Sequence, residues 1–176
     1  MANTYVLISS QVLGASAATV TFSSIPSTYT DLVLRASARS DIALGQTYDG
    51  FYVGLNGSAT TGSGTHLTGS GVSASSTRYN TSTGWMVKAQ NSTDGNGATA
   101  NTFGTAEVYI PSYTASQAKP LGIFGASETN ASATPMSATA GLWNNTATVS
   151  SIVIYTVDGS NWLTGSSFYL YGIKNS

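Results

Sequence analysis

The chain has 176 residues, of which only 7% are charged, and its formal net charge is −1 at pH 7. An ordinary soluble domain carries about 25% charged residues, so the side chains that perform most acid–base chemistry are scarce here. The few basic residues are scattered, whereas nucleic-acid binding needs clustered Lys and Arg to neutralise phosphates. No stretch approaches the length of a membrane-spanning apolar segment. We therefore expect neither a nucleic acid nor a membrane as a partner.

The chain has no cysteine and a single histidine. Disulfides and thiolate metal sites are thereby excluded, and we expect no cofactor and no metal. The N-terminal residues lack the basic region and apolar stretch that are typical of a signal peptide. These features weigh against a secreted eukaryotic protein, which would often contain disulfides.

The hydrophobic residues make up 41% of the chain and occur in short runs that are rich in β-branched and aromatic residues. Disordered chains are poor in both, so the pattern predicts a folded β protein. In chain order, strands are predicted at residues 4–9, 19–22, 31–39, 51–55, 84–89, 100–110, 120–127, 138–143, 151–157 and 167–173.

Three of these runs have an interpretable pattern. The first, Tyr5 to Ile8, is apolar throughout and is interpreted as a buried opening strand. In the second, Val20 and Phe22 alternate with threonines and are expected to share one face. Residues 31–39 alternate most clearly, with Leu and Ala at the even positions and Val, Arg and Ser at the odd positions.

No amphipathic helix and no linker interrupt the predicted strands. Residues 56–76, rich in Gly, Ser and Thr, are interpreted as a structured surface excursion within a single domain spanning residues 1–176. The predicted fold is all-β, a single antiparallel β-sandwich of roughly nine to ten strands, with a jelly roll as the favoured topology.

The residues that could carry catalysis are few. His66 lies in a Gly- and Thr-rich stretch, and no strand–turn–helix context for a serine nucleophile accompanies it. A glycosidase would need two carboxylates facing each other across a cleft, whereas four of the seven lie at turn-like positions where Asp commonly bonds nearby backbone groups. The sequence 94–97 resembles a calcium loop but offers one carboxylate, so a turn is favoured. We therefore expect no enzymatic activity and no catalytic residues.

Four aromatic residues at predicted strand ends or in loops are the candidate binding or interface residues: Trp85, Tyr113, Trp143 and Trp162. Such side chains can cap the open ends of a sandwich core, anchor a protein interface, or form a sugar-binding surface beside Asn and Thr. The sequence leaves these three alternatives open.

Three stretches together resemble a group of tailed-bacteriophage virion proteins, described as tail-fibre-like or capsid-surface domains. They are residues 20–40, the pair 54–57 and 66–69, and residues 165–174. In the second stretch, Ser58 and Thr65 stand where the resemblance leads us to expect an aspartate and a tyrosine. The resemblance implies a jelly-roll-like sandwich and a role on a phage particle.

These observations predict a non-enzymatic structural protein of a phage virion. A decoration or cement protein on the outer capsid shell is favoured, because predicted strands fill the sequence and leave no shaft or tail anchor. The alternative is a tail-associated receptor- or carbohydrate-binding module. The expected partners are other virion proteins, either the major capsid protein or tail proteins, and further copies of the chain in a trimer or dimer. A host surface glycan is the partner under the alternative.

Overall fold

The computed structural model describes residues 4–43, 45–57, 62–81, 87–130 and 134–174. Among these residues there is no helix, and therefore none that is long and apolar enough to cross a membrane. The strands are β1 (Tyr5–Val12), β2 (Thr19–Phe22), β3 (Asp31–Ala38), β4 (Tyr48–Leu55), β5 (Gly62–Gly69), β6 (Ala74–Thr81), β7 (Val87–Asp94), β8 (Gly104–Ile110), β9 (Lys119–Ala126), β10 (Met136–Trp143), β11 (Ile152–Thr156) and β12 (Ser167–Ile173).

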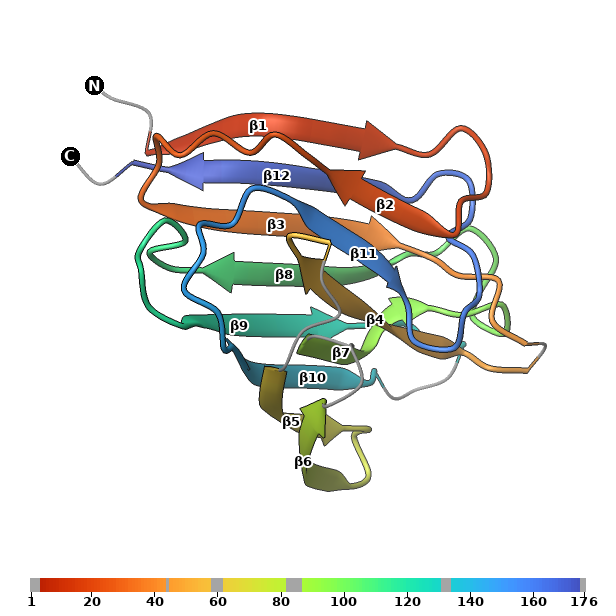
Figure 1. Cartoon of the computed structure of the whole chain (residues 1–176). Coiled ribbons are helices and arrows are strands. Elements are labelled where there is room, and N and C mark those ends of the chain that lie inside the picture. The colour runs from red at the N-terminus through yellow and green to blue at the C-terminus, as the bar shows by residue number, and fades with distance from the viewer. Residues whose placement is uncertain (1–3, 44, 58–61, 82–86, 131–133, 175–176) are drawn as a thin grey trace.

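The strands form two antiparallel sheets that pack face to face. The larger sheet has the order β1-β12-β3-β8-β9-β10-β5-β6, and the smaller has the order β2-β11-β4-β7. Figure 1 shows the smaller sheet crossing in front of the larger one. The prediction of an all-β antiparallel sandwich is confirmed.

The topology is that of a jelly roll with two inserted hairpins. When β5–β6 and β9–β10 are set aside, eight strands remain. Their order is first-eighth-third-sixth in one sheet and second-seventh-fourth-fifth in the other. This is the strand order of the eight-stranded jelly roll, which is built from two Greek keys. The two hairpins pair with each other through β10 and β5 and extend the larger sheet by four strands.

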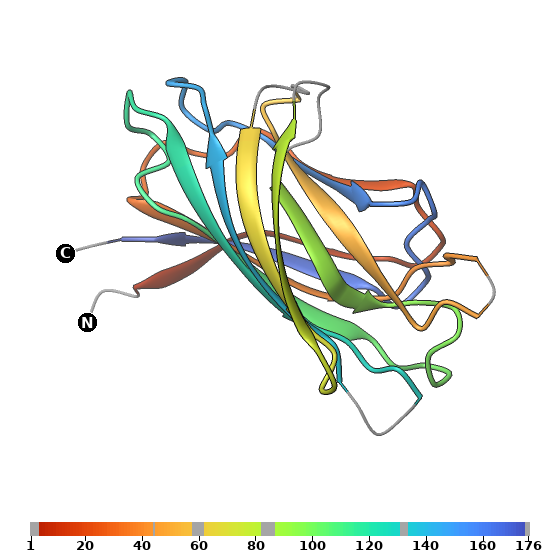
Figure 2. The ribbon, with the colours of Figure 1, turned by 90° about the horizontal axis from the view of Figure 1, so that it is seen from below.

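The extension curls around the edge of the smaller sheet. In Figure 2, β5 and β6 lie beside β7. The Tyr79 hydroxyl accepts a hydrogen bond of 2.9 Å from the Lys88 backbone N–H, and the Thr139 hydroxyl donates one of 3.1 Å to the Lys88 carbonyl. Side chains thus satisfy backbone groups of this edge strand, which would otherwise be free to pair with another chain.

The core lies between the two sheets and follows the alternation of the strands. β8 and β9 bury every second residue over most of their length, which is the pattern of a sheet with one face on the core. The largest fully buried apolar side chains are Trp143, Trp162, Tyr113, Phe51, Phe168, Leu32, Leu34, Leu55, Ile110 and Ile152.

Several strand bounds differ from the prediction: β4 begins at Tyr48 instead of residue 51, β7 continues to Asp94 instead of ending at residue 89, and β8 begins at Gly104 instead of residue 100. The first residues of the strand predicted at 84–89 lie outside the described residues.

Two larger corrections concern β1 and the segment 56–76. Tyr5 and Leu7 are about half exposed, because β1 is an edge strand of the larger sheet rather than a buried opening strand. The excursion at 56–76 contains β5 and begins β6, which pair along their whole length as an antiparallel hairpin. Twelve strands are therefore described in place of the nine or ten predicted.

Candidate functional site

The outward face of the extended sheet carries apolar side chains across four neighbouring strands. Phe124 of β9 is paired with Glu107 of β8 on one side and with Ala138 of β10 on the other. Ala138 is in turn paired with Leu67 of β5. Paired residues point to the same side of a sheet, so Phe124, Ala138 and Leu67 form one continuous outward row.

A shallow groove of about 510 Å³ runs over this face. Small residues line it where the next outward row continues, namely Gly122 of β9 and Ala140 of β10. Larger side chains stand beside them: Tyr109 is 38% exposed, Phe124 54% and Leu67 55%. We call this surface the sheet groove, defined by Leu67, Tyr109, Gly122, Phe124, Ala138 and Ala140.

The apolar character of the groove is unusual for its position. Antiparallel sheets that pack on a core with one face commonly place polar residues on the other. Here β9 buries Leu121 and Ile123 inward while it exposes Phe124 outward. A contiguous exposed apolar surface on a soluble domain commonly marks an interaction site.

Polar contacts hold the wall of the groove on the β8 side. The Tyr109 hydroxyl donates a hydrogen bond of 2.8 Å to Asp31, and this bond to a carboxylate raises the pKa of Tyr109. Glu107 accepts a hydrogen bond of 2.9 Å from Arg35, and both side chains are about half exposed. The tyrosine is therefore neutral and fixed, and the ion pair supplies a polar rim next to Phe124.

The sole histidine lies away from the groove. His66 belongs to β5, where residues alternate between the two faces, and it is 8% exposed whereas its neighbour Leu67 points outward. Its ring centroid is 5.6 Å from that of Tyr79. Burial lowers the pKa of His66, and the positive charge of Lys88 lowers it further, so the imidazole is neutral at pH 7. Within the described ranges, no three His, Asp or Glu side chains gather where they could hold a metal ion.

Three of the four sequence-predicted aromatic candidates lie in the core. Trp162 packs edge-to-face against Phe51 and Phe168, at ring-centroid distances of 6.4 Å and 5.4 Å. Trp143 ends β10 with its side chain turned inward, and the Tyr113 hydroxyl donates a hydrogen bond to the Pro26 carbonyl. All three are fully buried, so of the three alternatives that the sequence left open, the structure favours a place in the sandwich core for these residues.

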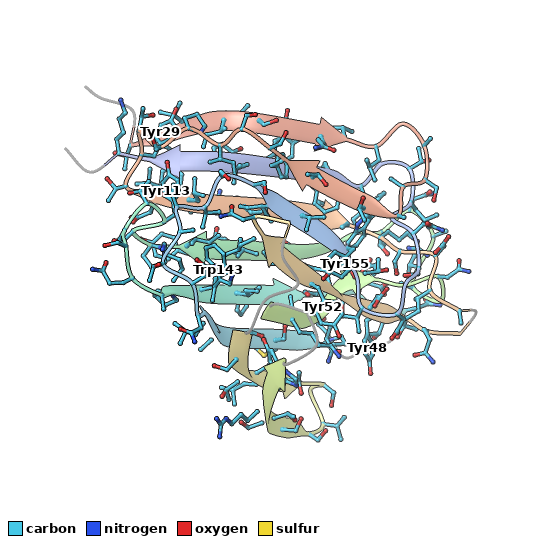
Figure 3. All side chains as sticks on the ribbon, in the orientation of Figure 1. Tyr29, Tyr48, Tyr52, Tyr113, Trp143 and Tyr155 are labelled. Carbon is cyan, nitrogen blue, oxygen red and sulfur yellow. The ribbon has the colours of Figure 1, made fainter. Side chains whose placement is uncertain are left out.

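The fourth candidate, Trp85, lies outside the described residues. The structure brings none of the three buried candidates to the groove, and Figure 3 shows Tyr113 and Trp143 among the strands of the sandwich. The groove residues were not singled out from the sequence. The one available signal was Phe124, a large apolar residue that falls on the outward face of a strand whose other large apolar residues, Leu121 and Ile123, face the core.

Comparisons with known proteins identify no relative. No protein-family model matches the chain, and neither the curated proteins nor the solved structures contain a significant match.

Proposed function

We propose that the protein is a non-enzymatic structural protein of a phage virion, placed on the outer capsid shell as a decoration protein. The observation that carries this proposal is the sheet groove, an exposed apolar surface on a rigid sheet. The resemblance of three sequence stretches to phage virion proteins supports the proposal, as does the jelly-roll strand order that this resemblance implies.

The partner proposed for the groove is a capsid subunit. Few charges surround the groove, and those of Arg35 and Glu107 already neutralise each other. Its recognition therefore depends on apolar burial and shape rather than on charge, as in the core of a stable protein interface. A second copy of the chain in the groove is the competing outcome, and the test below separates the two.

A particle-stability assay tests the proposal. Particles assembled without this protein are mixed with the purified chain, sedimented, and heated until they release their DNA. We expect the wild-type chain to sediment with the particles and to raise the temperature of DNA release. Phe124→Asp should fold normally, because Phe124 is exposed, and should lose both effects.

Val72→Ser is the matched control. Val72 is 92% exposed in the turn between β5 and β6, outside the groove, so this variant should behave like the wild type. The proposal is contradicted if the wild-type chain does not bind particles, or if Phe124→Asp binds them equally well. A Phe124→Asp variant that loses only self-association would assign the groove to a second copy.

The alternative, a tail-associated receptor- or carbohydrate-binding module, gains support from a different surface. The aromatic residues first assigned to it are buried or lie outside the described residues. However, a row of tyrosines next to a polar pocket lies on the smaller sheet, on the opposite side of the sandwich from the sheet groove.

A further inference from the structure

A break in the pairing of β4 and β7 opens a small pocket at the edge of the smaller sheet. Phe51 pairs with Ala89 and Asp49 pairs with Thr93, so one residue of β4 faces the three residues 90–92 of β7. Asn91 lies in this bulge with a φ of 53°. A pocket of about 180 Å³ lies there, which is consistent with bulges commonly re-aiming side chains at functional sites.

The pocket is lined by groups that can both donate and accept hydrogen bonds. Gln46 and Asn91 supply amides, Lys88 supplies an ammonium group, and Asp158 supplies a carboxylate from an exposed turn after β11. Lys88 and Asp158 carry opposite charges, and the third charged lining residue, Asp49, has both carboxylate oxygens bound within the protein, so no single charge dominates the groups that a ligand would meet. The lining therefore suits an uncharged polar ligand better than a strongly anionic or cationic one.

Asp49 forms part of the pocket wall, and it is held by the protein itself. Its two carboxylate oxygens accept hydrogen bonds from the Ser40 hydroxyl at 2.8 Å, the Ser160 hydroxyl at 3.0 Å and the Gly50 N–H at 2.6 Å. These bonds join the start of β4 to the segments after β3 and β11. Asp49 is thus a positioning residue that keeps the wall rigid, and Asp158 is the carboxylate available to a ligand.

A row of tyrosines adjoins the pocket. Tyr155 of β11 pairs with Tyr52 of β4, and their ring centroids are 5.6 Å apart. Tyr52 pairs in turn with Lys88, which lines the pocket. Tyr48, also a lining residue, is exposed and lies on the same strand as Tyr52, and Figure 3 labels both of them and Tyr155. Burial raises the pKa of Tyr155 to about 12, so its phenol is neutral at physiological pH.

We propose that this pocket and the adjoining tyrosines bind one residue of an uncharged glycan. A sugar ring has an apolar face of C–H groups, which can lie against an aromatic ring, and a rim of hydroxyls that both donate and accept hydrogen bonds. The tyrosine rings can contact the apolar face of the sugar, and the four polar side chains that line the pocket can hydrogen-bond its hydroxyls. The pocket is smaller than the roughly 300–1,000 Å³ of sites for drug-sized ligands, which fits a single sugar unit. This inference does not rest on the capsid placement.

Ligand-observed NMR tests the proposal. The full chain is titrated with glucose, galactose, mannose, rhamnose and N-acetylglucosamine, each as a monosaccharide and as a short oligosaccharide. We expect saturation transfer from the protein to at least one of these sugars, with a saturable dose response. Tyr48→Ala and Asp158→Asn should each weaken that binding about tenfold, in line with the loss of one aromatic or charge-assisted polar contact.

Tyr5→Ala is the matched control, since Tyr5 is an exposed tyrosine on β1 of the other sheet. It should leave sugar binding unchanged. Tyr48 and Asp158 are exposed, so we expect both variants to fold, and thermal unfolding of each variant checks this. The proposal is overturned if no sugar in the panel binds saturably, or if Tyr48→Ala and Asp158→Asn bind as tightly as the wild type.

Discussion

The Nη1 atom of Arg39 donates a hydrogen bond of 2.6 Å to the carbonyl oxygen of Thr99. The same guanidinium group donates to the carbonyls of Ala98 at 3.0 Å and Thr102 at 3.2 Å. It thereby ties the loop that leads from the smaller sheet into β8 to the end of β3. Arg39 is only 7% exposed, although the sequence pattern placed it on the face of the predicted strand opposite the Leu and Ala residues and gave no sign of burial.

Removal of this buried guanidinium group should destabilise the fold. Arg39→Met leaves several loop carbonyls without a donor, and we expect the free energy of unfolding to fall by about 2–4 kcal/mol. Arg35→Met is the matched control, because the exposed Arg35–Glu107 pair contributes about 0–1 kcal/mol. Urea unfolding of both variants measures the difference, and equal losses would contradict the role assigned to Arg39.

A side chain should destabilise the fold at one glycine of β9 and leave its stability nearly unchanged at another. A Cβ atom on Gly125 would lie 2.2 Å from the Cβ of Ser92, where β9 packs against β7, whereas a Cβ on Gly122 meets nothing within 4 Å. Gly125→Ala should therefore cost about 1–3 kcal/mol of stability through overpacking. Gly122→Val should leave stability nearly unchanged while it fills the sheet groove and weakens particle binding. Thermal unfolding and co-sedimentation measure the two effects, and a Gly122→Val variant that binds normally would argue against the groove.

The pH dependence of stability should carry a contribution from His66. Burial and Lys88 lower its folded-state pKa below 6.5, so in acid the unfolded chain takes up this proton first. The contribution of His66 is fully present above pH 6.5 and is lost as the pH falls through the lowered pKa. His66→Phe removes this contribution and can keep the contact with the Tyr79 ring. Urea titrations of both proteins below pH 6.5 measure it, and identical pH profiles would contradict the lowered pKa.

Asp49 should act in the opposite sense. Burial raises its folded-state pKa above 3.8, and this effect outweighs its hydrogen bonds to Ser40, Gly50 and Ser160. The protonated form is thus favoured by folding, so this contribution is fully present below pH 3.8 and is lost as the pH rises through the raised value. Compared with Asp49→Asn, the wild-type chain should lose stability over this rise in pH. If the stability of the wild-type chain does not fall relative to Asp49→Asn as the pH rises, or if it increases, the hydrogen bonds outweigh burial and the folded-state pKa is not raised.

Alternation revealed most of the fold, because one face of each jelly-roll strand is buried. The strands at 19–22 and 167–173 have the predicted bounds, and Val20 and Phe22 both face the core as expected. β5 and β6 carry mostly small and polar residues, so their strand character depends on pairing with β10 and with each other, which no local pattern records.

The candidate sites were harder to predict than the fold. Residue type pointed to the tryptophans, but Trp143 and Trp162 are fully buried, because their large apolar rings stabilise the core by the area they remove from water. The sheet groove depends on register across four strands, and the glycan pocket depends on a bulge that places Asn91 near Asp158. Both arise from contacts between residues that are far apart in the chain, so the sequence pattern alone did not predict them.

Immuno-electron microscopy of intact particles tests the central claim most directly. Particles produced from the genome that encodes this chain are labelled with an antibody against it and imaged without disruption. The proposed decoration role predicts label distributed over the whole surface of the head. Label confined to the tail tip, or no label on the particles, would contradict it.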